Sequence, residues 1–279
     1  MKKQPLALMN QFLFLLLLFI ASASVYAQTP AQQALALINQ ARWENGQLPP
    51  LKGVGALFGA AQAHSDAMAA RNFFMHCDPD TQTGAGARMT AAGYSWNSWA
   101  ENLAAGFTTP SAAVAGWLNS PGHRANLLRT TVNESGVGYV FDSADISNVR
   151  SSSMNTCTVD GTSGPWRHYW TQKFGRRSAV FPLVIAREAF SVSNCEADLY
   201  VYADSNPQQM RFRNDDDTWS GWRPYSANAV WALDGAAALD VLVSAQVRYQ
   251  NGSVSSASDS VRATSSCQSE LILVAGFEA

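Results

Sequence analysis

The sequence predicts an α+β protein with two domains, a first domain of mixed helices and strands and a second domain of strands alone. Apolar residues recur at helical spacing in several segments before residue 130, which is typical of amphipathic helices. After residue 177 apolar and polar residues alternate instead, which is typical of half-buried strands. The chain has 279 residues, more than one typical domain. We therefore place the two domains at residues 31–175 and 180–279.

The N-terminus has the layout of a cleavable signal peptide. Lys2 and Lys3 precede the apolar run 12–21, and the small-residue site Val25-Tyr26-Ala27 follows it. An uncharged core of about ten residues is too short to span a bilayer, which takes roughly 20. We predict that residues 1–27 are removed and that the mature protein is secreted or otherwise extracytoplasmic, with no transmembrane segment after cleavage.

The charge balance argues against a nucleic-acid partner. The chain has 19 basic and 21 acidic residues, and removal of Lys2 and Lys3 leaves 17 against 21, a formal charge of −4. A mature chain this acidic lacks the basic surface on which nucleic-acid binding depends.

Four helices are predicted in the first domain. Apolar residues at helical spacing place the first two over residues 31–45 and 57–72, and Gly46 ends the first. A hydroxyl residue followed by proline begins the other two, at residues 109–110 and 120–121.

Strands follow these helices in the first domain. Residues 136–142 and 168–174 alternate large apolar and smaller side chains, which predicts two strands of one antiparallel sheet. Between them lies a serine-rich stretch, residues 143–165, which contains Cys157. We predict a long loop there, held by a disulfide.

The second domain is predicted to be an antiparallel β-sandwich. Residues 239–249 alternate strictly, and Asn251-Gly252 is the signal for a tight hairpin turn. Together with TWSGWRPYS at 218–226 and the NGSVS turn, this pattern resembles the immunoglobulin-like or fibronectin-like modules of bacterial surface proteins.

Four cysteines remain in the mature chain, and export would take them to a compartment where disulfides persist. Four cysteines allow three connectivities. Given the domain boundary above, the pairing that keeps each bridge inside one domain is Cys77–Cys157 with Cys195–Cys267. We predict that pairing.

Six stretches of the first domain follow one another in a defined order: LALINQARWENGQLPPL (35–51), AHSDAMAARNFFMH (63–76), AENLAAG (100–106), AGWLNSPGHRANLL (115–128), GVGYVF (136–141) and HYWTQKFG (168–175). In this order they resemble the bacterial branch of the CAP superfamily, the SCP-type domain of cysteine-rich secretory, antigen 5 and pathogenesis-related proteins. The resemblance covers about 145 residues.

The resemblance implies a three-layer α/β/α sandwich with a groove lined by two histidines and acidic residues. Matched position by position, the groove residues are His76, Glu101 and His123. Many relatives have a second groove glutamate, but Ser120 stands at that position here. The four-residue constellation is therefore incomplete, which weakens the case for family-type catalysis.

Two roles for the groove residues stay open. Two histidines and one carboxylate suit zinc and leave a fourth position for water, so His76, His123 and Glu101 are candidate metal ligands. Alternatively, His123 and Glu101 hydrogen-bond each other and fix the groove without metal. A first-turn position in its helix favours neutral His123 in either case.

Other chemistry-bearing residues have simpler explanations. His64 lies on the apolar stripe of its helix and is expected to be a core histidine. No GxSxG motif occurs, so nucleophilic catalysis has little support. Four aromatic residues of the second domain offer a platform for sugar, but we favour a core role for them; they are Trp219, Trp222, Tyr225 and Trp231.

The sequence therefore predicts a non-enzymatic extracellular binding or interaction protein. Its groove would take an unidentified ligand, whether a divalent metal, a lipid or other small apolar molecule, a peptide or a polysaccharide. One alternative is a metal-assisted hydrolase of peptide or cell-envelope polymer, with Glu101 or a zinc-bound water as the base. Another is a structural or adhesive envelope protein that acts through the second domain.

Overall fold

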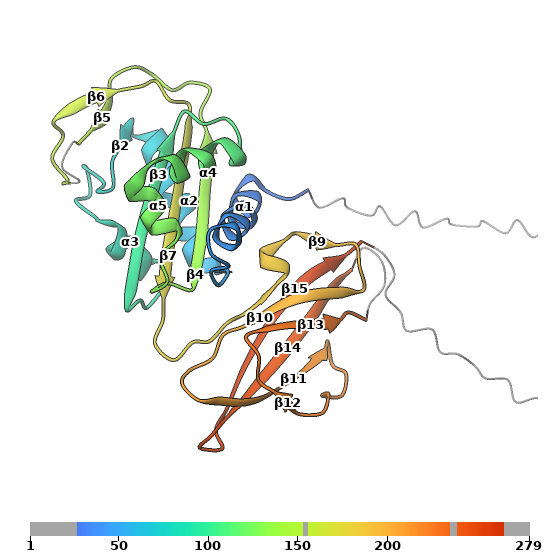
Figure 1. The fold of residues 1–279 in the computed structure, drawn as a ribbon. Helices are drawn as coiled ribbons and strands as arrows, with labels where there is room; N and C mark the ends of the chain where they lie inside the picture. Colours follow the sequence, from blue (N-terminus) through green and yellow to red (C-terminus); the bar gives the residue numbers. More distant parts are fainter. Residues whose placement is uncertain (1–26, 153–155, 235–238, 265–279) are drawn as a thin grey trace, which may run out of the picture.

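The computed structural model describes residues 27–152, 156–234 and 239–264. Within them, helices and strands mix in the first domain, whereas the second domain consists of strands and one short 3-10 turn (Figure 1). The predicted α+β fold class is confirmed. The predicted signal peptide lies outside the described residues, except for Ala27.

The predicted helices form at the predicted places. They are α1 (Pro30–Glu44), α2 (Gly55–Ala70), α4 (Pro110–Asn119) and α5 (Pro121–Leu127). Thr109 caps α4, because its hydroxyl accepts from Ala112 N at 3.2 Å, whereas Ser120 makes no side-chain cap at α5. The helix α3 (Ala85–Ala91) was not predicted, because it is short and its N-cap is Gly84, which offers no side-chain cap.

A four-stranded sheet runs through the first domain in the order β1-β4-β7-β3. Its strands are β1 (Lys52–Gly53), β4 (Glu134–Phe141), β7 (His168–Arg176) and β3 (Ser98–Ala105). β7 pairs antiparallel with both neighbours. β3 was not predicted, because five consecutive residues of it are buried and no alternation marks it in the sequence.

Helices cover both faces of this sheet and make three layers (Figure 1). One core cluster joins Ile38 of α1 and Trp117 of α4 to Trp170 of β7. On the opposite face, Met68 of α2 packs against Tyr169 of β7. Because neighbouring strand residues point to opposite faces, Trp170 and Tyr169 fill different layers.

Two glycines of β4 let α2 lie close to the sheet. A Cβ atom on Gly138 would stand 2.3 Å from backbone atoms of Ala61 and Gln62, and one on Gly136 would stand 2.2 Å from Phe58 N. The GVGYVF stretch therefore has glycine where helix and strand backbones touch.

The second domain contains two sheets around one core. The smaller has the order β13-β10-β8 and the larger β12-β11-β14-β15-β9. The predicted alternating strand forms β14, whose hairpin with β15 turns at Asn251-Gly252. The strands are β8 (Leu183–Ile185), β9 (Ser191–Val192), β10 (Glu196–Val201), β11 (Pro207–Asn214), β12 (Arg223–Pro224), β13 (Asn228–Ala232), β14 (Asp240–Tyr249) and β15 (Val254–Ala263).

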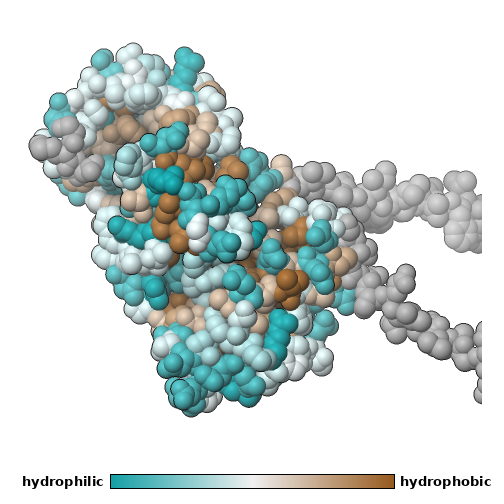
Figure 2. Space-filling model, in the orientation of Figure 1, coloured by the Kyte–Doolittle hydropathy of each residue, from teal (hydrophilic) through white to brown (hydrophobic). Residues whose placement is uncertain are grey.

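Polar contacts join the two domains. Lys52 Nζ lies 2.8 Å from Glu188 Oε1 and 2.5 Å from Asp259 Oδ1. The 3-10 turn η1 (Ala186–Glu188) has positive φ at three consecutive residues, and Asn39 Nδ2 donates to Arg187 O within it at 3.1 Å. Hydrophobic side chains also gather near the middle of the molecule, where the domains meet (Figure 2).

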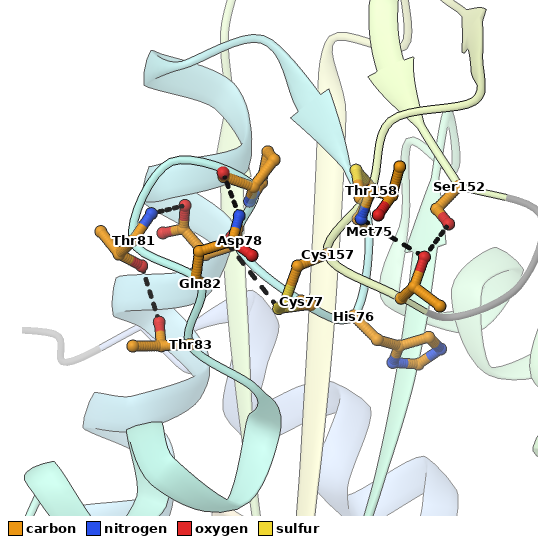
Figure 3. The surroundings of a disulfide bond; sticks show 12 residues. Met75, His76, Cys77, Asp78, Thr81, Gln82, Thr83, Ser152, Cys157 and Thr158 are labelled. Atoms are coloured by element: carbon orange, nitrogen blue, oxygen red, sulfur yellow. Dashed lines mark hydrogen bonds between the residues drawn. A yellow bond between two sulfur atoms is a disulfide. The ribbon is translucent and has the colours of Figure 1, made fainter.

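The serine-rich stretch is held by a disulfide, as predicted. Cys77 and Cys157 are bonded, with Cα atoms 4.9 Å apart (Figure 3). The stretch is not all loop: β5 (Val149–Ser151) and β6 (Gly161–Ser163) pair within it, and β5 also pairs with β2 (Phe73–Phe74). The second predicted bridge involves Cys267, which lies outside the described residues.

Candidate ligand-binding groove

The three residues predicted to form the site line one groove beside the edge strand β3. Its volume is about 530 Å³. His76 follows β2, Glu101 lies on β3, and His123 lies in the first turn of α5. The groove also has Trp99 and Arg129 among its lining residues. The fold thus brings together residues that are far apart in the sequence.

Glu101 is buried against two cations. Its side chain is 2% exposed, and the sheet register places Lys173 of β7 directly opposite it. Lys173 Nζ donates to Glu101 Oε2, and Arg88 Nη2 of α3 donates to the same oxygen at 3.0 Å. Two positive charges therefore face one carboxylate that solvent barely reaches.

These contacts fix the protonation states of the cluster. Burial alone would raise the pKa of the Glu101 carboxyl, but Lys173, His76 and Arg88 together hold that pKa well below its usual range. Burial lowers the pKa of Lys173 to about 8, and the charge of Glu101 opposes this shift. At neutral pH Glu101 is ionised and Lys173 is mostly protonated.

His76 is oriented by Glu101. Its Nδ1 atom lies 2.8 Å from Glu101 Oε1, and an ionised carboxylate only accepts, so Nδ1 carries a proton and Nε2 is the ring nitrogen that does not bond Glu101. The ring points away from the Cys77–Cys157 bond (Figure 3). The alternative in which His123 and Glu101 hydrogen-bond each other is therefore wrong: among the described residues, the imidazole that bonds this carboxylate belongs to His76.

Two asparagines fix His123 relative to β3. Asn102 Nδ2 donates to His123 O at 3.1 Å, and Asn126 Nδ2 donates to Asn102 Oδ1 at 3.0 Å. Burial lowers the pKa of His123, and the neighbouring His76 lowers it further. His123 is neutral at neutral pH, as the sequence predicts, although burial is the main cause.

The donor set does not fit a zinc site with three protein ligands. Across the described parts of the chain, no three His, Cys, Asp or Glu side chains are placed to hold a metal ion. Glu101 already contacts Lys173, Arg88 and His76, so it orients His76 and is not free to be a ligand. His76 and His123 would supply two nitrogens, fewer than the three protein ligands of a catalytic zinc site.

Several residues of the site were not predicted from the sequence, among them Trp99 and Arg129 of the groove wall. Lys173 lies in the quoted HYWTQKFG stretch, and a lysine inside a buried strand pattern was a usable signal, since such lysines are buried only when paired. Arg88, Asn102 and Asn126 carried no signal in one sequence, because their partners are set by tertiary contacts.

His64 is a core residue, as predicted. It is fully buried, and its Nε2 atom lies 3.0 Å from Met75 O. Burial lowers its pKa to about 3. It is therefore neutral at neutral pH and takes no part in the groove.

Known proteins share the first domain. A family model described as the cysteine-rich secretory protein family, CAP, matches residues 35–174. The uncharacterized protein YkwD of Bacillus subtilis is 36% identical over 120 residues, which are 43% of this chain and 44% of that protein. The chain thus spans less than half the length of this curated relative.

Solved structures give similar matches. An extracellular protein containing a SCP domain from Bacillus anthracis is 30% identical, with a TM-score of 0.41 over 53% of this chain and 40% of that chain. A cysteine-rich secretory protein of Staphylococcus aureus is 18% identical, with a TM-score of 0.35 over 53% of this chain and 39% of that chain.

Proposed function

Because the chain belongs to the cysteine-rich secretory protein (CAP) family, we propose that it is a secreted, non-enzymatic binding protein. Its groove at His76, Glu101 and His123 holds a ligand that carries a carboxylate, such as the end of a peptide. The Cys77–Cys157 bond supports secretion, because disulfides persist outside the cytoplasm.

The observation that carries the proposal is the charge balance of the groove. Glu101 is the one acidic side chain among the described lining residues of the groove. Its single negative charge is paired with two positive charges, those of Lys173 and Arg88. Arg129 lies exposed on the groove wall. The surplus is positive, and a concave site of one sign attracts the opposite charge.

The remaining walls suit an apolar group beside that carboxylate. Trp99 is 37% exposed and is braced edge-on by Trp96, with ring centroids 5.9 Å apart. The Nε2 atom of His76 is left to hydrogen-bond a polar group of the ligand, such as a peptide amide. Metal-assisted hydrolysis lacks a third protein ligand among the described residues, so binding is proposed without catalysis.

The test compares two probes that differ in one group. The mature chain is titrated by calorimetry with N-acetyl-dialanine as the free acid and as the C-terminal amide. We expect the acid to bind at least ten-fold more tightly, because only the acid can pair with Arg129.

Two variants separate the groove from general charge. Arg129→Ala should abolish the preference for the acid. Arg124→Ala is the matched control, because Arg124 is exposed on α5 and contacts Asn45, away from the groove. Equal binding of acid and amide by the wild type, or no binding at millimolar concentration, would overturn the proposal.

A further inference from the structure

A stack of alternating arginine and tryptophan side chains lies on the larger sheet of the second domain. The Cζ atom of Arg248 lies 3.9 Å from the ring centroid of Trp222, and Arg211 lies 4.4 Å from the same ring. Arg211 also lies 5.0 Å from Trp219, and Arg213 lies 4.9 Å from that ring. We call these five residues the Arg–Trp ladder.

The strand pattern puts the ladder on the outer face of the sheet. In β11, Met210 and Phe212 are buried in the core, so Arg211 and Arg213 point the other way. The register pairs Gln209 with Arg248 of β14, which adds the third arginine to that face. Trp219 and Trp222 belong to the segment after β11, which folds back over the arginines.

The three arginines have no acidic partner in the part of the chain that the structure describes. Across the described residues, none of them lies within ion-pair distance of a carboxylate. Two of them donate to neutral side-chain amides: Arg211 Nε to Gln246 Oε1 at 2.8 Å and Arg248 Nη1 to Gln209 Oε1 at 3.0 Å. The Nε atom of Arg213 is buried without a partner.

Several other arginines among the described residues pair with a carboxylate. Arg88 pairs with Glu101, Arg150 with Asp80, and Arg177 with Glu134. The three ladder arginines instead make no ion pair among the described residues, although the exposed acidic run 215–217 follows β11 directly in the chain.

The strands next to the ladder offer hydroxyl and amide groups. Gln246 of β14 pairs in register with Ser256 of β15, and Ser244 pairs with Ser258. These positions alternate with the buried residues Val243, Ala245 and Val247, so they share the outer face. They supply hydrogen-bond partners for sugar hydroxyls.

We propose that the Arg–Trp ladder binds an acidic polysaccharide. Guanidinium groups pair in a two-pronged way with carboxylate or sulfate groups. Each indole ring of the ladder lies against two of the guanidinium groups, so the stack holds the arginines in place before the ligand arrives. The site belongs to the second domain and does not depend on the function proposed for the groove.

The experiment is affinity electrophoresis of the mature chain through gels that contain polygalacturonate, dextran sulfate or neutral dextran. We expect retardation by the first two polymers, which differ in the anion that they carry, and none by dextran. Added sodium chloride should weaken the retardation, because salt screens charge pairing.

Single variants connect the binding to the ladder. Arg213→Gln and Arg248→Gln should each weaken the binding of the acidic polymers at least five-fold, whereas Arg124→Gln, which removes the same charge from the first domain, should not. If Arg248→Gln fails to fold, Arg248→Lys replaces it as the test variant, because it keeps the positive charge. Arg248→Lys should also bind the acidic polymers more weakly than the wild type, because lysine lacks the planar guanidinium.

Three outcomes would overturn the proposal. They are no retardation of the wild type by either acidic polymer, equal retardation by neutral dextran, and unchanged binding by the folded ladder variants. Arg129→Ala should leave polymer binding unchanged, so that a failure here is distinct from a failure at the groove.

Discussion

Glu101 keeps its charge inside the protein because Lys173, Arg88 and His76 surround it. Taking a carboxylate out of water is expensive, and such a group stays ionised only when it is paired. The cluster thus explains why a glutamate stands on an otherwise buried stretch of β3. It also explains how His76 is held with one nitrogen free.

The cost of breaking this cluster is testable. Glu101→Gln leaves Lys173 and Arg88 buried without a counter-charge, so we expect it to lower the free energy of unfolding by about 3–5 kcal/mol. The double variant Glu101→Gln/Lys173→Met should recover much of that loss, because it removes a charge from each side. Urea unfolding measures both, and a Glu101→Gln protein as stable as the wild type would contradict the account.

His64 makes the protein sensitive to acid. Its pKa of about 3 in the folded protein lies below the ordinary value of 6.5. Between these two pH values His64 binds a proton in the unfolded chain but not in the folded protein. Stability is therefore lost as the pH falls from 6.5 towards 3, by about 1.4 kcal/mol per pH unit.

The matched variant is His64→Gln, which can still donate to Met75 O but does not titrate. Between pH 7 and pH 5, the free energy of unfolding should fall for both proteins. The fall for His64→Gln should be smaller than the fall for the wild type by about 2 kcal/mol. Parallel pH dependence of the two proteins in urea unfolding would show that His64 is not the cause.

At this scale the sequence predicted the residues of the groove better than their contacts. His76, Glu101 and His123 stand in recognisable stretches, so their meeting could be foreseen. The alternative that paired Glu101 with His123 was wrong, since Glu101 contacts His76 instead. The choice between the two histidines depends on how β2, α3 and α5 approach β3. A single sequence does not contain that geometry.

At the scale of elements, amphipathic helices and the hairpin strands could be predicted because half-buried elements carry a periodic pattern. β3 carries none, since it is buried on both sides. α3 spans seven residues, too few to show a period, and it carries Arg88. Two of the elements that the sequence did not predict, β3 and α3, therefore carry Glu101 and its partner Arg88.

Gly138 tests the contact between α2 and the sheet. Gly138→Ala should destabilise the protein by about 3 kcal/mol, because the added Cβ overlaps the α2 backbone. Gly59→Ala is the control on α2 itself: nothing lies within 4 Å of its added Cβ, and we expect a gain of about 0.5–1 kcal/mol. Thermal unfolding measures both, and equal effects would refute the close approach.

At the scale of the whole molecule, Lys52 links the two domains by facing Glu188 and Asp259 together. The boundary between residues 175 and 180 stays a prediction, and the connector contains Arg177, a trypsin site. Lys52→Met leaves two carboxylates unpaired at the junction, so we expect trypsin to cleave the connector several-fold faster than in the wild type.

Lys52→Arg keeps the charge and should be cleaved at nearly the wild-type rate. If Lys52→Met resists trypsin as well as the wild type does, the ion pairs do not hold the domains together.

The central claim is that the groove recognises a carboxylate through its surplus positive charge. The most direct measurement is NMR of the His76 and His123 imidazoles while N-acetyl-dialanine is added as the acid or as the amide. We predict that the acid shifts the resonances of both rings in a saturable way and that the amide does not. Equal shifts with both probes, or none with either, would contradict the account.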